Sequence, residues 1–264
     1  MQSQPYRSSY SSNLAAGREA GLARFFTQTY AWMSFGLAIM GVTGYLTANS
    51  PTMHQLLFGN GLVRLLVALG WMAMTVTFQS RLHRVQPATA ANMFLAYSVA
   101  TGVMLSSYFL IYTGGSMARV FLLTSASFAG AASFGAFTKR DLQPVTQFMM
   151  IGLIGVIVAS LVNMFMRSEA IYWMSTYAMV LIFAGLSASK NQELRQMYAA
   201  QGGAGNLAIA GALSLSLSFL NLFLALLRIF RQRAPLDGNG RGRAHTRPTL
   251  AVFFYATDNI YVFR

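Results

Sequence analysis

The side chains that could do acid–base or metal chemistry lie outside the long apolar segments of this chain. The six carboxylates are Glu19, Asp141, Glu169, Glu193, Asp237 and Asp258, and the three histidines are His54, His83 and His245. The histidines fall in loops or in the C-terminal tail without metal-ligand spacing, and no Ser-His-Asp order is evident. Cysteine is absent, which excludes disulfides and thiol-ligated metals. The sequence therefore predicts no enzyme, no catalytic residue, no metal site and no cofactor.

Polar groups of another kind lie in the last apolar segment, Leu207–Phe230, which reads LAIAGALSLSLSFLNLFLALLRIF. About 20 apolar residues rising 1.5 Å each cross a bilayer core of roughly 30 Å, so this segment is predicted to span a membrane. Its middle carries Ser214, Ser216, Ser218 and Asn221. Hydrocarbon cannot satisfy such groups, so they should face other helices or a cavity. The segment is therefore predicted to be surrounded by protein.

The composition of the chain is that of a polytopic membrane protein. Hydrophobic residues make up 55% of the 264 residues and charged residues only 9%, and the mean hydropathy is +0.47. An average soluble domain has about 25% charged residues. The net charge of +13 is spread over loops and the tail, as anionic lipid and membrane topology require. The expected partner is therefore the lipid bilayer, and no nucleic acid is expected to bind.

Seven spans are expected in one integral domain, followed by a tail of different composition. Their approximate bounds are Phe26–Ala48, Leu56–Phe78, Ala88–Tyr112, Ser116–Phe137, Val145–Met166, Ile171–Ser189 and Leu207–Phe230. The sixth is expected to continue as a surface helix through residues 190–200. Residues 1–25 are predicted to form a flexible basic arm, 26–231 the seven-span domain, and 232–264 a loop-like C-terminal extension.

Two features within the spans are assigned to membrane insertion and packing rather than to chemistry. Arg64 has no acidic partner in any span, and snorkelling to the nearer headgroups is favoured over a functional charge. The fourth span is rich in Gly, Ala and Ser, and spacings such as Ala131 and Gly135 let helices approach closely.

Lysine and arginine residues in short loops predict the orientation. The N-terminal arm contributes three, and the loops after spans two, four and six contribute two each. Only Arg119 and Arg167 oppose them near span ends, so the N-terminus is predicted to be cytoplasmic. Arg228, Arg231 and Arg233 at the end of the last span disfavour an external C-terminus. Either this helix inserts after the topology is fixed, or it does not cross completely.

The last span also carries a resemblance to a known family. Ala212–Phe223, ALSLSLSFLNLF, is similar to the last-span pattern A-L-S-L-x-L-D-F-I-N-L-F of the Bax inhibitor-1 family, in its bacterial YccA-like branch. Other similar stretches are TQTYAWM (27–33), LSSYFLIYTGGSMARVFLLTSASF (105–128), GAFTKRDL (135–142) and IGLIGVIVASLVNMF (151–165). The resemblance covers most of the chain and implies an all-α integral membrane fold, a seven-transmembrane-helix bundle around a central last helix.

The family's best-known chemistry depends on two aspartates, one in the last span and one at the cytoplasmic end of the sixth. They share a proton and gate a calcium leak. Two carboxylates held close cannot both stay ionised cheaply, so one pKa rises and the pair becomes a pH switch. By resemblance these positions fall on Ser218 and on Lys190, because the sixth-span motif T-A-Y-D-T-Q reads SASKNQ here. The switch cannot operate here as in the aspartate-bearing members.

The resemblance also points to residues around the switch. The family's basic residue at the cytoplasmic end of the second span is similar in placement to Arg84, and less closely to Arg81. Without the two acids it would meet Lys190, and repulsion between like charges would push Lys190 toward the headgroups. Asn221 and Asn163 match the family as well, although a polar residue that only bridges helices by hydrogen bonds is the more common case.

Two functions follow from this resemblance. One is a non-enzymatic factor of the bacterial inner (plasma) membrane in ion (calcium) homeostasis or stress survival, with a lost or altered pH switch. The alternative is an interaction protein that binds and modulates a membrane-anchored ATP-dependent protease or other membrane machinery, because some bacterial members resemble inhibitors or substrates of such a protease. The missing carboxylates favour the alternative, and the polar last span favours the first.

Overall fold

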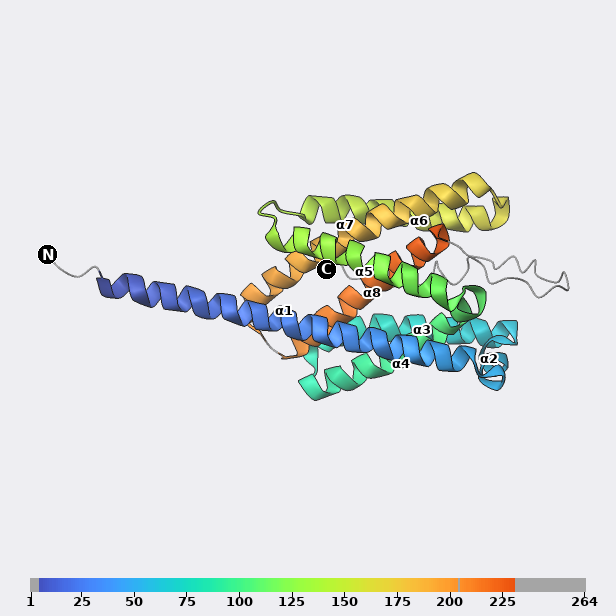
Figure 1. Cartoon of the computed structure of the whole chain (residues 1–264), viewed down its shortest axis with the longest axis horizontal. Coiled ribbons are helices and arrows are strands. Elements are labelled where there is room, and N and C mark those ends of the chain that lie inside the picture. Colours follow the sequence, from blue (N-terminus) through green and yellow to red (C-terminus); the bar gives the residue numbers. More distant parts are fainter. Residues whose placement is uncertain (1–4, 204, 231–264) are drawn as a thin grey trace.

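The computed structural model describes residues 5–203 and 205–230, and its regular elements are all helices (Figure 1). In chain order they are α1 (Pro5–Ala48), α2 (Pro51–Phe58), α3 (Gly61–Arg81), the 3-10 helix η1 (Leu82–Arg84), α4 (Pro87–Ile111), α5 (Gly114–Phe137), α6 (Gln143–Met166), α7 (Glu169–Gln201) and α8 (Gly205–Ile229). Among these residues, seven helices are long and apolar enough to cross a membrane, namely all but α2 and η1. The predicted all-α fold with seven spans is confirmed.

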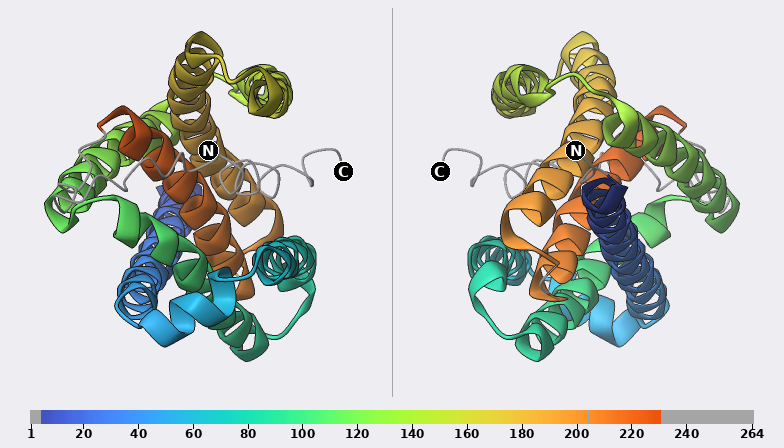
Figure 2. Two further views of the ribbon diagram at one scale, coloured as in Figure 1. Left: turned by 90° about the vertical axis from the view of Figure 1, so that its right-hand side faces the viewer. Right: turned by 90° about the vertical axis from the view of Figure 1, so that its left-hand side faces the viewer.

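The last helix, α8, lies at the centre of the bundle (Figure 2). Of its most apolar stretch 94% is buried inside the protein, whereas the corresponding shares of the other six spans lie between 17% and 44%. Helices α1 and α4 pack against each other and against α8 on one side, and α5 and α7 do so on the other. Helix α6 lies outside this layer and packs mainly on α7. The predicted arrangement around a central last helix is therefore confirmed.

Capping residues explain where most of the helices begin and end. Asn60, Thr113 and Ser168 precede α3, α5 and α7, and each side-chain oxygen accepts a hydrogen bond from a backbone N–H of the first turn. Pro144 stands in the first turn of α6, where its missing N–H costs nothing. Helix α6 ends at Arg167, which adopts the left-handed conformation with φ 54°. Such local signals bring most predicted boundaries close to the observed ones.

The N-terminal residues differ from their prediction. Helix α1 continues back to Pro5, so residues 5–25 are helical where the sequence predicts a flexible arm. This stretch has no proline after Pro5 and contains several Ala, Leu, Arg and Glu residues, which are good helix formers. The helix that crosses the membrane can therefore propagate beyond it. The predicted C-terminal extension, residues 232–264, lies outside the described residues.

Two other boundaries also differ. The second span begins at Gly61 rather than at Leu56, because Asn60 caps α3 and the preceding residues form the separate short helix α2. The continuation of the sixth span is part of α7 as one uninterrupted helix. Its first residues, Lys190 and Asn191, are buried and do not belong to a surface helix. The bundle therefore encloses α7 further along its length than hydropathy alone indicates.

The loops alternate between the two ends of the bundle, and the charges are distributed unequally between them (Figure 1). We call "the basic end" the one that holds the start of α1, the α3–α4 and α5–α6 turns and the end of α7. Among the side chains that the structure describes, its basic ones are Arg18, Arg24, Arg81, Arg84, Lys139, Arg140, Lys190 and Arg195. The opposite end has Arg64, Arg119, Arg167 and Arg228. Arg64 is exposed in the first turn of α3, as expected for a snorkelling side chain.

Glycines allow two close approaches between helix backbones. A Cβ at Gly102 of α4 would lie 2.6 Å from the carbonyl oxygen of Met40 in α1. A Cβ at Gly135 of α5 would overlap the carbonyl oxygen of Ala188 in α7. Because backbone atoms cannot move aside as a flexible side chain can, both positions require glycine for the helices to approach this closely. The expected packing role of Gly135 is thus visible in the structure.

We expect Gly135→Ala to lower the melting temperature of the detergent-solubilised protein, because overpacking against a backbone oxygen costs about 1–3 kcal/mol. The matched control is Gly130→Ala on the same helix, where a Cβ meets nothing within 4 Å. That control should be neutral or slightly stabilising, because alanine favours helix over glycine by up to about 1 kcal/mol. Equal melting temperatures for the two variants would contradict the proposed packing.

The charge asymmetry between the two ends predicts the orientation in the membrane. The chain has no cysteine, so single introduced cysteines report without background. In Arg140→Cys a membrane-impermeant thiol reagent should label only from the cytoplasmic side, and in Ser168→Cys only from outside. Labelling of both positions from the reverse sides would invert the topology, and labelling of both from one side would exclude a span between them.

Candidate functional site

Ser214, Ser218 and Asn221 form a polar strip along one face of α8, inside the bundle, and Ser216 lies on the opposite face. Ser216, Ser218 and Asn221 have no exposed surface at all, and Ser214 is partly buried. Within the described residues, the Ser216 hydroxyl oxygen has no hydrogen-bond partner. Hydroxyl and amide groups can orient a water molecule or bridge helices, and none of them changes charge near neutral pH. This strip can therefore form hydrogen bonds but cannot transfer protons as a carboxylate pair does.

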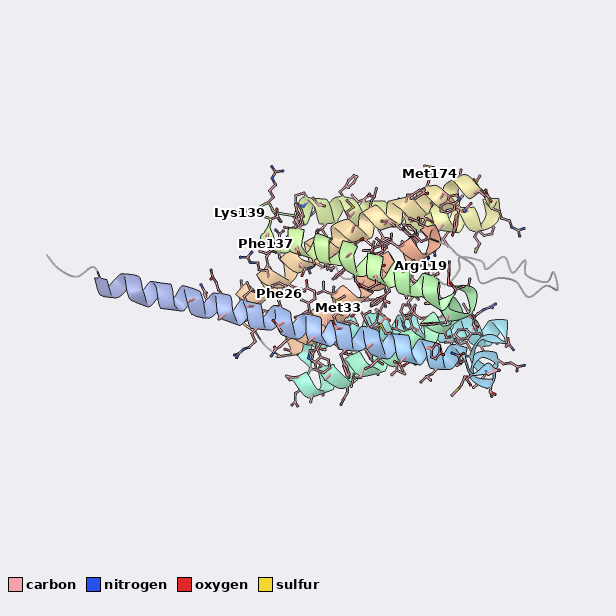
Figure 3. The ribbon with its side chains drawn as sticks, viewed as in Figure 1. Phe26, Met33, Arg119, Phe137, Lys139 and Met174 are labelled. Atoms are coloured by element: carbon pink, nitrogen blue, oxygen red, sulfur yellow. The ribbon has the colours of Figure 1, made fainter. Side chains whose placement is uncertain are left out.

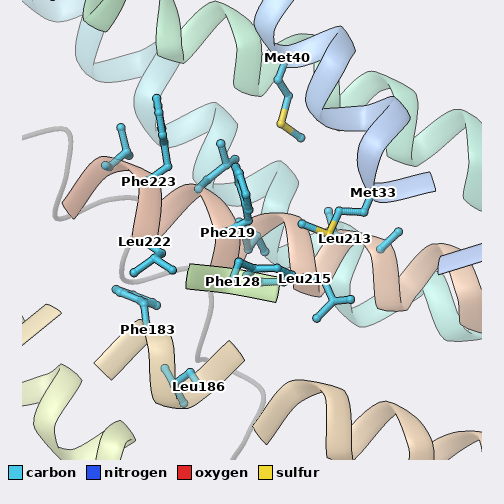
Figure 4. Packing of buried hydrophobic residues seen from close by; sticks show 14 of the residues in the cluster. Met33, Met40, Phe128, Phe183, Leu186, Leu213, Leu215, Phe219, Leu222 and Phe223 are labelled. Atoms are coloured by element: carbon cyan, nitrogen blue, oxygen red, sulfur yellow. The ribbon is translucent and has the colours of Figure 1, made fainter. Parts of the chain in front are cut away.

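The two positions that resemble the family's switch lie on the helices α7 and α8, which pack against each other. Leu194 of α7 approaches within 2.9 Å of the point that a Cβ at Gly211 of α8 would occupy, and Phe183 of α7 points at Leu222 of α8 (Figure 4). Both pairs have the same antiparallel register. It sets Ser218 of α8 level with the residue of α7 that lies three positions before Lys190, a separation of about 4.5 Å along the helix axes.

Lys190 is buried, and its ammonium group is paired with a carboxylate on the same helix. Its Nζ lies 3.2 Å from Oε2 of Glu193, which follows three residues later on the same helix. The side chain of Lys190 is 11% exposed and that of Glu193 50% exposed. The ion pair therefore draws the lysine along α7 toward the basic end. The structure shows a carboxylate of the same helix beside Lys190, and the expected repulsion of Lys190 by Arg84 stays a prediction.

The other residues selected by resemblance are more dispersed. Arg81 and Arg84 are exposed at the turn after α3, which packs against α8 through η1. Asn221 is buried one turn beyond Ser218 on α8. Asn163 lies at the opposite end of the bundle, where its Oδ1 accepts a 2.7 Å hydrogen bond from the backbone N–H of Ser168. It holds the α6–α7 turn and is remote from the switch positions.

Sequence reasoning missed Asn191, the residue next to Lys190. Its Oδ1 accepts a 2.6 Å hydrogen bond from the hydroxyl of Tyr30 in α1, and its Nδ2 donates to the carbonyl oxygen of Ser187 at 3.1 Å. Asn191 is 1% exposed. A helical face through Ser187, Asn191 and Leu194 could have indicated its burial, because residues three and four apart share one side of a helix. The bond ties α7 to α1 at the basic end.

The α5–α6 turn is fastened to the same part of α7. Gln192 donates from Nε2 to the carbonyl oxygen of Arg140 at 2.8 Å and accepts at Oε1 from the N–H of Leu142, also at 2.8 Å. Arg195 donates from Nη1 to the carbonyl oxygen of Ala136 at 3.1 Å. The residues of α7 that follow Lys190 therefore also hold the α5–α6 turn in place.

A cleft of about 930 Å³ lies between α1 and α5, and we call it the α1–α5 cleft. Its floor includes Met33, Phe128 and Phe219, which are all buried. Phe219 of α8 makes edge-on ring contact with Phe128 and with Phe121 of α5, at centroid distances of 5.6 and 5.4 Å (Figure 4). The Tyr30–Asn191 hydrogen bond lies at the basic end of the cleft.

The fold and this site define a class: an integral membrane protein of seven long helices in which the last helix is enclosed in the bundle and carries buried polar side chains. The chain belongs to the Bax inhibitor-1 family, because residues 22–234 match the family described as "Inhibitor of apoptosis-promoting Bax1". It is 36% identical over 219 residues to "Inner membrane protein YbhL" of Escherichia coli, covering 81% of this chain and 94% of that protein. An uncharacterized protein of Caulobacter vibrioides is 35% identical over 224 residues, and the match covers 80% of this chain and 90% of that protein.

A third relative extends the comparison beyond these two. An uncharacterized membrane protein of Streptococcus pyogenes is 33% identical over 226 residues, which cover 80% of this chain and 94% of the relative. The resemblance found in the sequence motifs is therefore confirmed, and it extends over all seven spans. The comparisons support a polytopic membrane protein and an E. coli relative in the inner membrane.

The Tyr30–Asn191 bond is open to a test by mutation. We expect Tyr30→Phe to lower the melting temperature in detergent, because a buried amide oxygen that loses its donor costs about 1–3 kcal/mol in soluble proteins and about 0.6 on average between membrane helices. Adding Asn191→Leu should recover part of the loss, because both partners are then apolar. Tyr177→Phe at an exposed position of α7 is the control. The variant Asn191→Leu is also measured alone. If the double variant loses as much stability as the two single variants lose in sum, the bond contributes nothing.

Proposed function

We propose that this protein is a non-enzymatic factor of ion (calcium) homeostasis or stress survival in a bacterial inner membrane, in which the pH switch of the family is lost. One observation carries the proposal. The two positions that resemble the family's switch aspartates are both buried, Ser218 on the central helix α8 and Lys190 on the adjacent helix α7, and they hold a hydroxyl and an amine group. Both side chains therefore lie inside the bundle, and neither is a carboxylate that could share a proton.

The remaining acids support this view. In the described residues, Glu19, Asp141, Glu169 and Glu193 are all exposed, and Glu193 forms the ion pair with Lys190. Calcium requires about six to eight hard oxygen ligands, and carboxylates supply the compensating charge. In the part of the chain that the structure describes, no group of three or more acidic or histidine side chains gathers that could hold a metal ion. A proton-gated calcium path therefore has no acidic site there.

The calcium test compares the native protein with a restored pair. We expect the native protein in dye-loaded liposomes to show little pH-dependent calcium influx between about pH 6 and 8, because Ser218 and Lys190 provide no pair of carboxylates that could share a proton. Ser218→Asp with Lys190→Asp should introduce a pH-dependent influx, since two coupled carboxylates titrate as a pair. A single buried carboxylate costs roughly 2.5–3.5 kcal/mol on insertion scales, so Ser218→Asp alone should stay largely protonated and weakly active.

The matched control is Ser216→Asp with Lys190→Asp, which adds the same two acids but points one of them to a different face of α8. It should remain inactive while the Ser218 double variant responds to pH. A native protein that already leaks calcium with a steep pH dependence would place the sensor elsewhere and overturn the proposed loss of the switch.

The alternative, an interaction protein that modulates a membrane-anchored protease, has its own supporting observation. Helix α6 packs mainly on α7, and only 17% of its most apolar stretch is buried. Gly155 on this helix has open space where a Cβ would stand, so another helix could approach there. Recovery of a stoichiometric protease complex from mild detergent, lost on Gly155→Leu, would favour this function over ion homeostasis.

A further inference from the structure

The α1–α5 cleft opens sideways, where the surrounding bilayer would lie. Its rim consists of small exposed residues, among them Ser34 and Ala38 on α1 and Ala129 and Ser133 on α5. The cleft extends along α5 from Phe121 to Phe137, which corresponds to about 24 Å at 1.5 Å per residue. One leaflet of a hydrocarbon core of roughly 30 Å is shorter than that. A straight hydrocarbon chain therefore fits lengthwise.

The volume and the lining of the cleft suit an apolar ligand. Its volume of about 930 Å³ lies within the range of about 300–1,000 Å³ in which proteins usually hold small ligands. The buried floor is mostly aromatic and aliphatic, and its polar group, Asn191, is already bonded to Tyr30. Such a floor offers contacts to methylene groups along its length and few hydrogen bonds. This is the chemistry of an acyl-chain site.

Basic residues near one end of the cleft indicate which kind of lipid headgroup would fit there. Phe26 and Phe137 line its basic end (Figure 3). Arg24 precedes Phe26 by two residues, and Lys139 and Arg140 follow Phe137 in the exposed α5–α6 turn. The guanidinium of Arg195 reaches the same turn through its bond to the carbonyl oxygen of Ala136, a residue of the cleft. Four cations thus lie on the segments of α1, α5, the α5–α6 turn and α7 that adjoin this end of the cleft.

Two of the three carboxylates described at this end are engaged elsewhere, and the third, Glu19, lies further out on α1, beyond Arg24. Asp141 accepts a hydrogen bond from the N–H of Gln143 at the start of α6, and Glu193 is paired with Lys190. The basic end therefore attracts anions, and a second copy of this chain, whose corresponding end is equally basic, would be repelled. Charge complementarity thus favours an anionic lipid over self-association.

We propose that the α1–α5 cleft is a binding site for an anionic phospholipid of the leaflet at the basic end. One acyl chain lies along α1 and α5 over Phe128 and Phe219, and the phosphate lies among Lys139, Arg140 and Arg195. The ligand class is a glycerophospholipid with net negative charge. It binds from the side, through the opening between the two helices, and contacts α8 without entering the bundle.

The test uses the purified full-length chain and native mass spectrometry from detergent, with phosphatidylglycerol and phosphatidylcholine of identical acyl chains as probes. The native protein should retain one phosphatidylglycerol far more strongly than one phosphatidylcholine. Lys139→Gln with Arg140→Gln should weaken retention of the anionic lipid by at least tenfold, because each cation near an anionic headgroup contributes about fivefold. Arg81→Gln with Arg84→Gln removes two charges at the same end, away from the cleft, and should change retention little.

A second pair of variants tests the acyl-chain part of the site. Ala129→Phe fills the cleft and should abolish retention of the lipid, whereas Ala126→Phe, at an exposed position of α5 that does not line the cleft, should not. Both variants are checked for an unchanged helical circular dichroism spectrum. The proposal is wrong if the native protein retains the two lipids equally, or if the two phenylalanine variants behave alike.

The rival occupant is a helix of another protein, and it has a distinct outcome. Ser133→Cys places a single thiol on the rim of the cleft in a chain without other cysteines. A bifunctional thiol reagent applied to native membranes should yield no protein adduct in stoichiometric amount. Recovery of such an adduct, blocked by Ala129→Phe, would overturn the lipid assignment in favour of a protein interface.

Discussion

The structure depends on one constraint, which is that hydrogen-bonding side chains cannot be left facing hydrocarbon. Ser216, Ser218 and Asn221 occupy the middle of a helix that must cross a membrane, and all three have no exposed surface. Only a helix enclosed on every side satisfies this requirement. The other six spans can expose most of their apolar stretches to lipid without such a cost. The perimeter of α8 is filled before α6 is reached, which explains why α6 packs on α7 and lies outside.

Enclosing α8 imposes a second requirement, because the surrounding helices must also pack closely on one another. Gly102 lets α4 approach the backbone of α1, and Gly135 lets α5 approach the backbone of α7. These contacts draw α1 toward one group of helices and α5 toward the other. The α1–α5 cleft is the space that remains between the two groups, and Phe219 of α8 closes its floor. Close packing at two glycines and an open cleft between their helices therefore have the same cause.

The sequence predicts the spans well because their determinants are local. Apolar length, proline and capping residues such as Asn60 and Ser168 act within one turn, and seven long helices follow from them. The sequence does not predict the N-terminal extension of α1, because its polar composition is typical of a flexible arm. It does not predict α2 as a separate helix either, because the apolar composition of that stretch is typical of a membrane span. Helix propensity and an asparagine cap decided these cases.

The candidate site was less predictable, because its residues meet through tertiary contacts. The serines of α8 predict its burial. The sequence predicts a surface helix over residues 190–200, however, where the structure buries Asn191. Its bond to Tyr30 joins residues 161 positions apart, and no local pattern specifies such a pair. The α1–α5 cleft could not be predicted either, because small residues such as Ala129 and Gly135 share one helix and look alike in sequence. Only the neighbour across the interface distinguishes the close contact from the open rim.

Fold and switch are separable in this architecture. The serines and the asparagine that remain on α8 still require enclosure, so the bundle keeps its form although the two positions that resemble the switch carry no acid. A hydroxyl at Ser218 avoids the cost of a buried carboxylate. Lys190 in turn needs a counter-charge that an aspartate there would not, and Glu193 supplies it one turn nearer the basic end. The side chains at these two positions thus affect the electrostatics of one helix end and leave untouched the hydrogen-bonding requirement that encloses α8.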